Sequence, residues 1–121
     1  MTTATVYGRI KELGVTDLSA SANASVRAQV GYGPATSNPE YEAGWTWTNA
    51  TFNAGFVDAT YDEYQASFTA PASGTYRYVY RFSFDQGMSW TYADTNLGDG
   101  GAGSDPGFTF DFSNEAVMTV P

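Results

Sequence analysis

The stretch SGTYRYVYRFSFDQGMSWTYADTN, residues 73–96, holds the longest uninterrupted hydrophobic alternation in the chain. Aromatic residues occupy every second position of its first half: Tyr76, Tyr78, Tyr80, Phe82 and Phe84. Successive side chains of a β-strand point to opposite faces, so these rings share one face that is too apolar to remain in water. Asp85, Gln86 and Gly87 supply a turn, and residues 89–92 begin a returning strand. The stretch therefore predicts a hairpin at the centre of an all-β core.

Further segments with strand-like alternation flank this hairpin. Residues 25–32 place small apolar side chains inward, and the inward parity continues at Tyr32, at the rim or inside the core. Residues 45–52 alternate so that Trp45 and Trp47 share one side of a strand. The remaining predicted strands cover residues 5–10, 64–68, 108–112 and 116–120.

Seven or eight short strands without helices between them favour two packed antiparallel sheets. We expect a β-sandwich of immunoglobulin or fibronectin type, with a closed small barrel as the alternative. A chain of 121 residues is long enough to bury a core without metal or disulfide staples. Residues 1–121 are therefore predicted to form a single β-sandwich module, excised from a larger secreted protein.

The composition argues against several classes of function. A net charge of −8, from 13 acidic and 5 basic residues, disfavours nucleic acid as a partner. No run approaches the roughly 18 apolar residues of a membrane span. The chain has neither cysteine nor histidine, so catalysis would rest on carboxylates. Most acids lie in loops beside glycine, where solvation keeps a carboxylate pair ionised, and we therefore expect no enzyme and no catalytic residues.

Three tryptophans are the candidate binding residues. Trp45, Trp47 and Trp90 lie at or near strand ends, in a chain that already has enough other apolar side chains to fill a core. Proteins bind a sugar by laying its apolar face on an aromatic ring while polar groups bind its hydroxyls. The alternative is burial between the sheets, as a sandwich commonly does with one tryptophan. Trp90 follows a turn, which favours exposure.

The run FSFDQGMSWTYADTN at residues 82–96, with Gly31, Tyr32, Gly33 and the segment 45–47, resembles the starch-binding modules of carbohydrate-binding families 25 and 26. These are small β-sandwiches attached to secreted bacterial amylases. In them an early strand presents a His or Tyr, the next segment a Trp, and a late F-x-x-x-x-G-x-x-W hairpin another ring. The resemblance implies stacking by Tyr32, by Trp45 or Trp47 and by Trp90, and hydroxyl binding by Asp94 or Asn96.

This resemblance implies a non-catalytic, extracellular or cell-surface module that binds a neutral polysaccharide, namely an α-glucan such as starch. Its expected partners are the polysaccharide and the flanking catalytic domain of a parent protein, and we expect a monomer without nucleic-acid or membrane contacts. The run APASGTY at residues 70–76 also resembles generic immunoglobulin-like modules of secreted bacterial proteins. The alternative function is therefore a structural spacer or a protein-interaction module.

A glycine-rich acidic tract at residues 94–105 raises the question of a cofactor. Asp94, Asn96, Asp99 and Asp105 offer oxygen ligands on a flexible backbone, which is the donor set that Ca²⁺ prefers. Their spacing departs from the EF-hand loop by one residue before Asp99. The alternative is a solvated turn with its acids in water, so we expect either no cofactor or Ca²⁺ at this tract.

Overall fold

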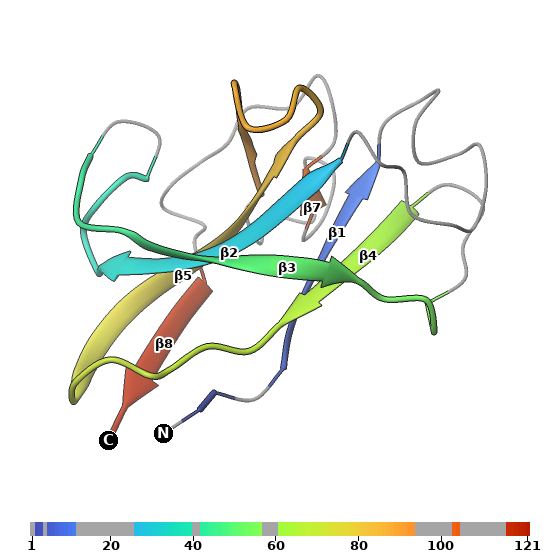
Figure 1. The fold of residues 1–121 in the computed structure, drawn as a ribbon. Coiled ribbons are helices and arrows are strands. Elements are labelled where there is room, and N and C mark those ends of the chain that lie inside the picture. Colours follow the sequence, from blue (N-terminus) through green and yellow to red (C-terminus); the bar gives the residue numbers. More distant parts are fainter. Residues whose placement is uncertain are drawn as a thin grey trace.

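The computed structural model describes residues 2–3, 5–11, 26–39, 42–56, 61–93, 103–104 and 116–121 (Figure 1). These residues form eight β-strands and no helix. The strands are β1 (Val6–Lys11), β2 (Arg27–Pro34), β3 (Thr46–Phe52), β4 (Tyr61–Ala66), β5 (Gly74–Ser83), β6 (Thr91–Tyr92), β7 (Gly103–Ser104) and β8 (Ala116–Val120). A helix long and apolar enough to cross a membrane is accordingly not found in the described ranges.

The strands form one curled sheet with the order β6-β5-β2-β3-β4-β1-β7, in which β8 also pairs with β5. Strand β3 belongs to two layers, because its residues 46–50 pair with β2 and its residues 51–52 pair with β4. The first layer contains β2, β5, β6 and β8, and the second contains β1, β4 and β7 (Figure 1). All pairs are antiparallel except β1 with β7. The predicted antiparallel, sandwich-like all-β fold is confirmed.

The aromatic strand forms the centre of the core, as its alternation predicts. Phe82 is fully buried, and its ring stacks on Tyr80 with centroids 5.8 Å apart. The ring of Tyr64 in the second layer contacts the ring of Phe82, with centroids 5.9 Å apart and an interplanar angle of 64°. This edge-on contact joins the two layers. The buried cluster consists of Ile10, Val26, Ala28, Val30, Tyr64, Phe68, Tyr80, Phe82 and Ala93. Burial of this apolar surface drives the packing of the two layers.

The turn after β5 has the backbone geometry that its sequence predicts. Gln86 and Gly87 both have positive φ, at 65° and 91°. The hydroxyl of Ser83 accepts a hydrogen bond from the Gly87 N–H at 2.8 Å, which closes the turn. The returning strand β6 begins at Thr91, two residues later than the alternation predicts, so Trp90 lies just before the paired segment.

Tyr76 makes a hydrogen bond that is typical of immunoglobulin-like sandwiches. Its hydroxyl donates to the backbone carbonyl of Ala72 at 2.9 Å, across the turn that precedes β5. A tyrosine that bonds back to the backbone a few residues upstream is the tyrosine corner of such folds.

We expect Tyr76→Phe to lower the free energy of unfolding by about 1 kcal/mol, because it removes this hydrogen bond and keeps the ring. Chemical denaturation of both proteins measures the difference. Tyr7→Phe is the matched control, since Tyr7 is 54% exposed on β1 and should tolerate the loss of its hydroxyl. Equal stability of Tyr76→Phe and the natural chain would contradict the structural role of this bond.

The later part of the chain differs from the sequence prediction at one point. The predicted strand at residues 108–112 lies outside the described residues. The sequence predicts no strand in the tract at residues 94–105, yet β7 lies within it and pairs with Arg9 and Ile10 of β1. This pairing uses only backbone groups, which leave no trace in the side-chain pattern.

Candidate functional site

Trp45 and Trp47 lie on the outer face of the first layer and not between the layers. Each ring packs directly on a glycine of β2: a Cβ at Gly31 would come within 2.4 Å of Trp47, and a Cβ at Gly33 within 2.6 Å of Trp45. The register explains this contact, because Gly31 pairs with Trp47 and any larger residue would occupy the space of the ring. The two indoles stack with centroids 5.8 Å apart and an interplanar angle of 23°.

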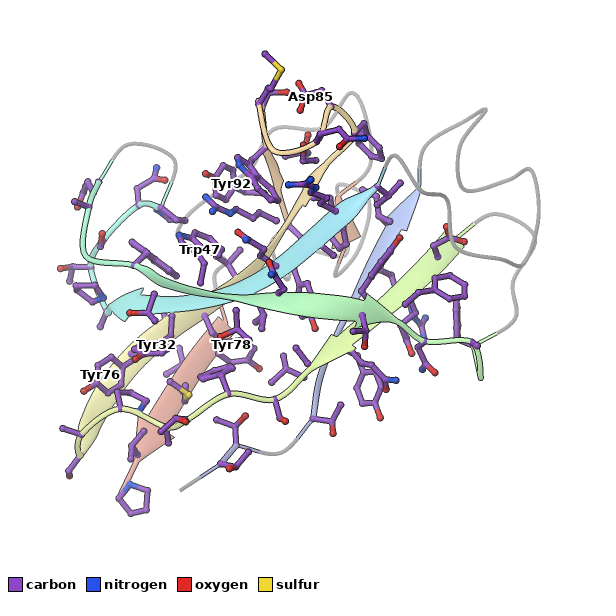
Figure 2. All side chains as sticks on the ribbon, in the orientation of Figure 1. Tyr32, Trp47, Tyr76, Tyr78, Asp85 and Tyr92 are labelled. Carbon is purple, nitrogen blue, oxygen red and sulfur yellow. The ribbon has the colours of Figure 1, made fainter. Side chains whose placement is uncertain are left out.

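Arg81 of β5 connects these rings to the third tryptophan. Its guanidinium carbon lies 3.8 Å from the ring centroid of Trp47 and 4.2 Å from that of Trp90. Tyr92 of β6 pairs with Arg81 in the sheet, and its ring centroid lies 6.0 Å from that of Trp47. Trp45, Trp47, Trp90 and Tyr92 thus form one continuous group, which we call the indole face. Figure 2 shows Trp47 and Tyr92 on the same side of the first layer.

A row of hydrogen bonds crosses four strands next to these rings. The Nε and Nη2 groups of Arg81 both donate to Gln29 Oε1, at 2.9 and 2.6 Å. Gln29 Nε2 in turn donates to Asn49 Oδ1 at 2.9 Å, and Arg81 Nη1 donates to the Tyr92 hydroxyl at 3.4 Å. The row therefore fixes the side-chain orientation of Arg81. It also places amide, hydroxyl and guanidinium groups next to the rings, where they can bind hydroxyl groups.

Tyr32 lies on the opposite face of β2 from the indole face (Figure 2). Its ring stacks on Phe68 with centroids 5.3 Å apart and meets Tyr76 edge-on at 5.8 Å. Adjacent residues of a strand point in opposite directions. Because Gly31 faces the outer side, Tyr32 points inward. The structure brings together Trp45, Trp47 and Trp90 of the predicted stacking residues, and it places Tyr32 with the core.

A hydrogen bond, in addition to the contact with Gly33, fixes the orientation of Trp45. Its indole N–H donates to the Ser37 hydroxyl at 3.0 Å, and Ser37 is only 4% exposed. The ring is half-buried, because one face rests on Gly33 and the polar edge is turned toward the loop after β2. A ring held in this way loses little further freedom when a ligand stacks on it, which favours binding.

Asp85 organises the turn that leads to Trp90. Its Oδ1 accepts hydrogen bonds from the Ser83 hydroxyl at 2.7 Å and the Ser89 N–H at 2.8 Å, and its Oδ2 accepts one from the Ser89 hydroxyl at 2.5 Å. These bonds favour the ionised carboxylate, and they lower the pKa of Asp85 from its ordinary 3.8 to about 2, with the Ser89 hydroxyl as the largest cause.

The effect of Asp85 on stability should depend on pH. A carboxylate with a lower pKa in the folded than in the unfolded state stabilises the fold above its unfolded pKa, about 3.9, and loses this contribution as the pH falls toward 2. We expect Asp85→Asn to have a lower melting temperature than the natural chain at pH 6, and the difference to shrink between pH 4 and pH 2. Thermal unfolding across this range measures it, and a difference that does not change with pH would contradict the assignment.

The polar residues predicted from the acidic tract cannot be placed at the indole face. Asp94 and Asn96, expected to bind hydroxyls, and Asp99 and Asp105, expected with them to bind Ca²⁺, lie outside the described residues. Within the described ranges, no three His, Cys, Asp or Glu side chains gather in a group that could hold a metal ion. The calcium hypothesis for the tract stays a prediction.

Two buried polar groups lie on the inner face of β4. Asp62 is 2% exposed and Tyr64 is 4% exposed, and neither Asp62 Oδ2 nor the Tyr64 hydroxyl has a hydrogen-bond partner in the described part of the chain. Burial raises the pKa of Asp62. Burial, and then the charge of Asp62, raise the pKa of Tyr64 to about 12. Both shifts keep these groups neutral over a wider pH range, and the groups belong to the core.

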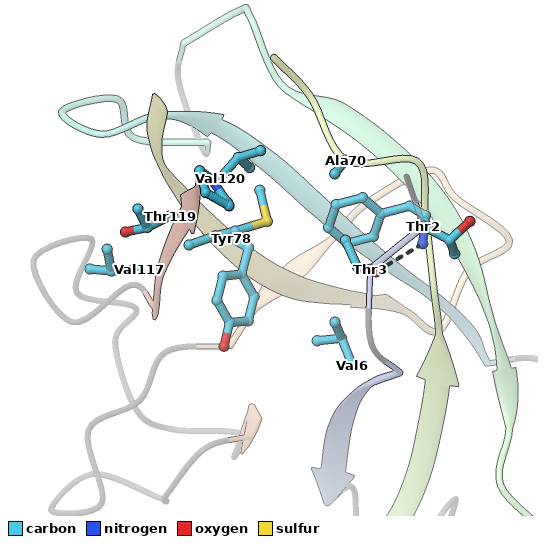
Figure 3. A pocket seen from close by; sticks show the side chains of 11 residues that line it. Thr2, Thr3, Val6, Ala70, Tyr78, Val117, Thr119 and Val120 are labelled. Atoms are coloured by element: carbon cyan, nitrogen blue, oxygen red, sulfur yellow. Dashed lines mark hydrogen bonds between the residues drawn. The ribbon is translucent and has the colours of Figure 1, made fainter. Parts of the chain in front are cut away.

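An open pocket of about 370 Å³ lies between β8 and the N-terminal segment (Figure 3), and none of its lining residues belongs to the indole face. Its lining includes Val6, Phe68, Tyr78, Met118 and Val120. Apart from the hydroxyl groups of Tyr78 and three threonines, its side chains are apolar, and none carries a charge. The pocket offers no group for acid–base catalysis and few donors for a sugar, so the indole face is the stronger candidate site.

Sequence reasoning missed Arg81, Gln29 and Tyr92 as members of the site. Arg81 and Gln29 appear in the sequence only as outward residues of alternating strands. The sequence does hold one indication of the site. Gly31 and Gly33 point outward like Gln29, and glycines at such positions of a strand indicate that another group packs closely on this face.

Comparison with known proteins gives one informative match. The amylopullulanase of Thermoanaerobacter thermohydrosulfuricus is 38% identical to this chain over 53 residues. These residues make up 44% of this chain and 4% of amylopullulanase, so this chain is similar to a small part of a much longer protein. No family model matches the chain, and no solved structure matches it.

Proposed function

We propose that this chain is a single non-catalytic carbohydrate-binding module and that its ligand is a neutral α-glucan such as starch. The indole face binds the glucan, with sugar rings stacked on Trp45 and Trp90 and their hydroxyls bound by neighbouring polar groups. In this proposal the module belongs to a larger secreted protein, functions outside the cell and works as a monomer beside a catalytic domain.

The observation that carries the proposal is the position of the three indoles. They lie together on the outer face of one layer, while tyrosine, phenylalanine and aliphatic side chains fill the interior. The three rings are half-buried and are not members of the core cluster. A module that served only as a spacer would gain nothing from such a cluster, since apolar groups gathered outside the core are typical of binding surfaces. Aromatic faces beside amide and guanidinium donors match the apolar face and polar rim of a sugar.

The partial similarity to amylopullulanase supports the choice of ligand. That protein is an enzyme whose name marks it as active on starch-type glucans, and the matched segment is a small fraction of its length. A short segment shared with such an enzyme is consistent with an accessory module, and it gives no reason to place a catalytic site in this chain. Three carboxylates of the described residues already have structural roles, because Asp85 is engaged in a turn, Asp62 lies in the core and Glu63 pairs with Arg9.

Affinity electrophoresis tests the proposal directly. In a native gel that contains soluble starch, the natural chain should migrate more slowly than in a gel without polysaccharide, and a gel with hydroxyethyl cellulose should cause less retardation. Trp90→Ala should remove most of the retardation, whereas Tyr7→Ala should keep it, because Tyr7 is an exposed ring on the other layer. Migration of the natural chain that starch does not change would reject α-glucan binding and leave the spacer function.

A further inference from the structure

We infer that Arg81, oriented by Gln29, is the positioning residue of the indole face: it holds Trp90 in the place where a glucan can stack on it. This inference rests on the proposed function for its ligand. Its geometric part concerns Trp90 alone and can be tested without any ligand.

Within the described part of the chain, Trp90 is not paired with a neighbouring strand. It precedes β6, which has only two residues and pairs with β5 through Arg81 and Phe82. The turn before it contains two residues with positive φ, so the chain changes direction sharply just ahead of the ring. The position of the indole therefore depends on side-chain contacts.

The guanidinium of Arg81 provides such a contact. It lies 3.8 Å from the Trp47 centroid and 4.2 Å from the Trp90 centroid, so one planar cation bridges both rings. Trp47 is itself fixed on Gly31. The order Gly31, Trp47, Arg81, Trp90 thus connects the end of the hairpin to the backbone of the central strand.

Gln29 fixes the guanidinium in this position. Its Oε1 accepts two hydrogen bonds from Arg81, and its own amide donates to Asn49. No carboxylate of the described residues pairs with Arg81. The ion pair that the described residues do form joins Arg9 and Glu63 in the other layer. A neutral acceptor leaves the full positive charge available to the two rings, since no anion competes for it.

A lysine cannot replace this arginine. The guanidinium is planar and weakly hydrated, so it can stack on two rings and donate to Gln29 at the same time. An ammonium group is compact and strongly hydrated, and it has no plane to stack. We therefore expect a charge-conserving substitution to disturb Trp90 while the charge of the site is unchanged.

The test uses Arg81→Lys and Gln29→Leu in the full chain. Arg9→Lys is the matched control, because Arg9 also lies over a ring, that of Phe56 at 4.3 Å. Titration calorimetry with maltoheptaose should show about tenfold weaker binding for Arg81→Lys and a smaller loss for Gln29→Leu. Gln29→Leu alters no ring, so weaker binding together with a change at the tryptophans in the absence of ligand identifies positioning.

Acrylamide quenching of tryptophan fluorescence gives the second readout, without ligand. Quenching should increase in Arg81→Lys and Gln29→Leu but stay at the natural level in Arg9→Lys. Natural quenching and natural affinity in Arg81→Lys would overturn the inference, and so would an affinity loss in Arg81→Lys that Gln29→Leu does not share. If the natural chain does not bind maltoheptaose, the proposed function fails, and the quenching result alone decides the role of Arg81.

Discussion

Phe82→Ala is expected to lower the free energy of unfolding by about 3–5 kcal/mol, the usual cost of removing a buried phenylalanine ring. Phe82 is fully buried and contacts Tyr80 in its own strand and Tyr64 in the opposite layer. Its removal leaves a cavity at the point where the two layers meet. Such a loss is a large fraction of the stability of a domain of this size, so part of the variant should be unfolded at moderate temperature.

Denaturant titration of Phe82→Leu and Phe82→Ala measures this effect as a series. Phe82→Leu should fall between the natural chain and the alanine variant, because leucine refills part of the cavity. Tyr7→Ala is the surface control and should change stability by less than about 0.5 kcal/mol. A cost below about 1 kcal/mol for Phe82→Ala would contradict the central place of β5 in the core.

Among substitutions that replace no aromatic residue, we expect Gly31→Ala to weaken binding most. The added methyl would lie 2.4 Å from Trp47, a distance that real Cβ atoms do not show, so the indole must move. Displacement of Trp47 also removes the ring on which the Arg81 guanidinium rests. Arg81 can then no longer hold Trp90 in place. We expect affinity for maltoheptaose to fall at least about tenfold, and stability to fall by about 1–3 kcal/mol from overpacking.

Gly55→Ala is the matched control for this prediction. A Cβ there would meet only the end of the Asn53 side chain at 3.3 Å, on a turn that lies outside the indole face. Calorimetry and thermal unfolding of both variants separate binding from stability. Natural affinity in Gly31→Ala, with a native fold, would show that the position of Trp47 does not matter for the ligand.

Much of the fold could be predicted from the sequence because it is encoded in the alternation of apolar and polar residues. The rings of β5, the inward residues of β2 and the shared side of Trp45 and Trp47 all follow from a period of two. The division of β3 between two layers could not be predicted, since a strand that pairs with β2 and then with β4 has no separate side-chain signature. Strand β7 was missed for the same reason.

The candidate site was predictable in part. The surplus of indoles over what a core needs indicated a binding surface, and the three tryptophans do lie together outside the interior. Their connection through Arg81 could not be predicted, because it depends on the register that sets β5 beside β2 and brings Gln29 opposite Arg81. Order along the chain grouped Tyr32 with the tryptophans, whereas parity within β2 places it with the core.

The central claim, that the indole face is the glucan-binding surface, is tested most directly by nuclear magnetic resonance. A titration of the ¹⁵N-labelled chain with maltoheptaose can follow the indole N–H signals of all three tryptophans and the backbone amides. The account predicts that the Trp90 and Trp45 indole signals and the Tyr92 amide shift on binding, while the amides of Val6 and Met118 at the apolar pocket stay unchanged. Indole signals that do not move at saturating maltoheptaose, or shifts confined to the pocket between β8 and the N-terminal segment, would contradict it.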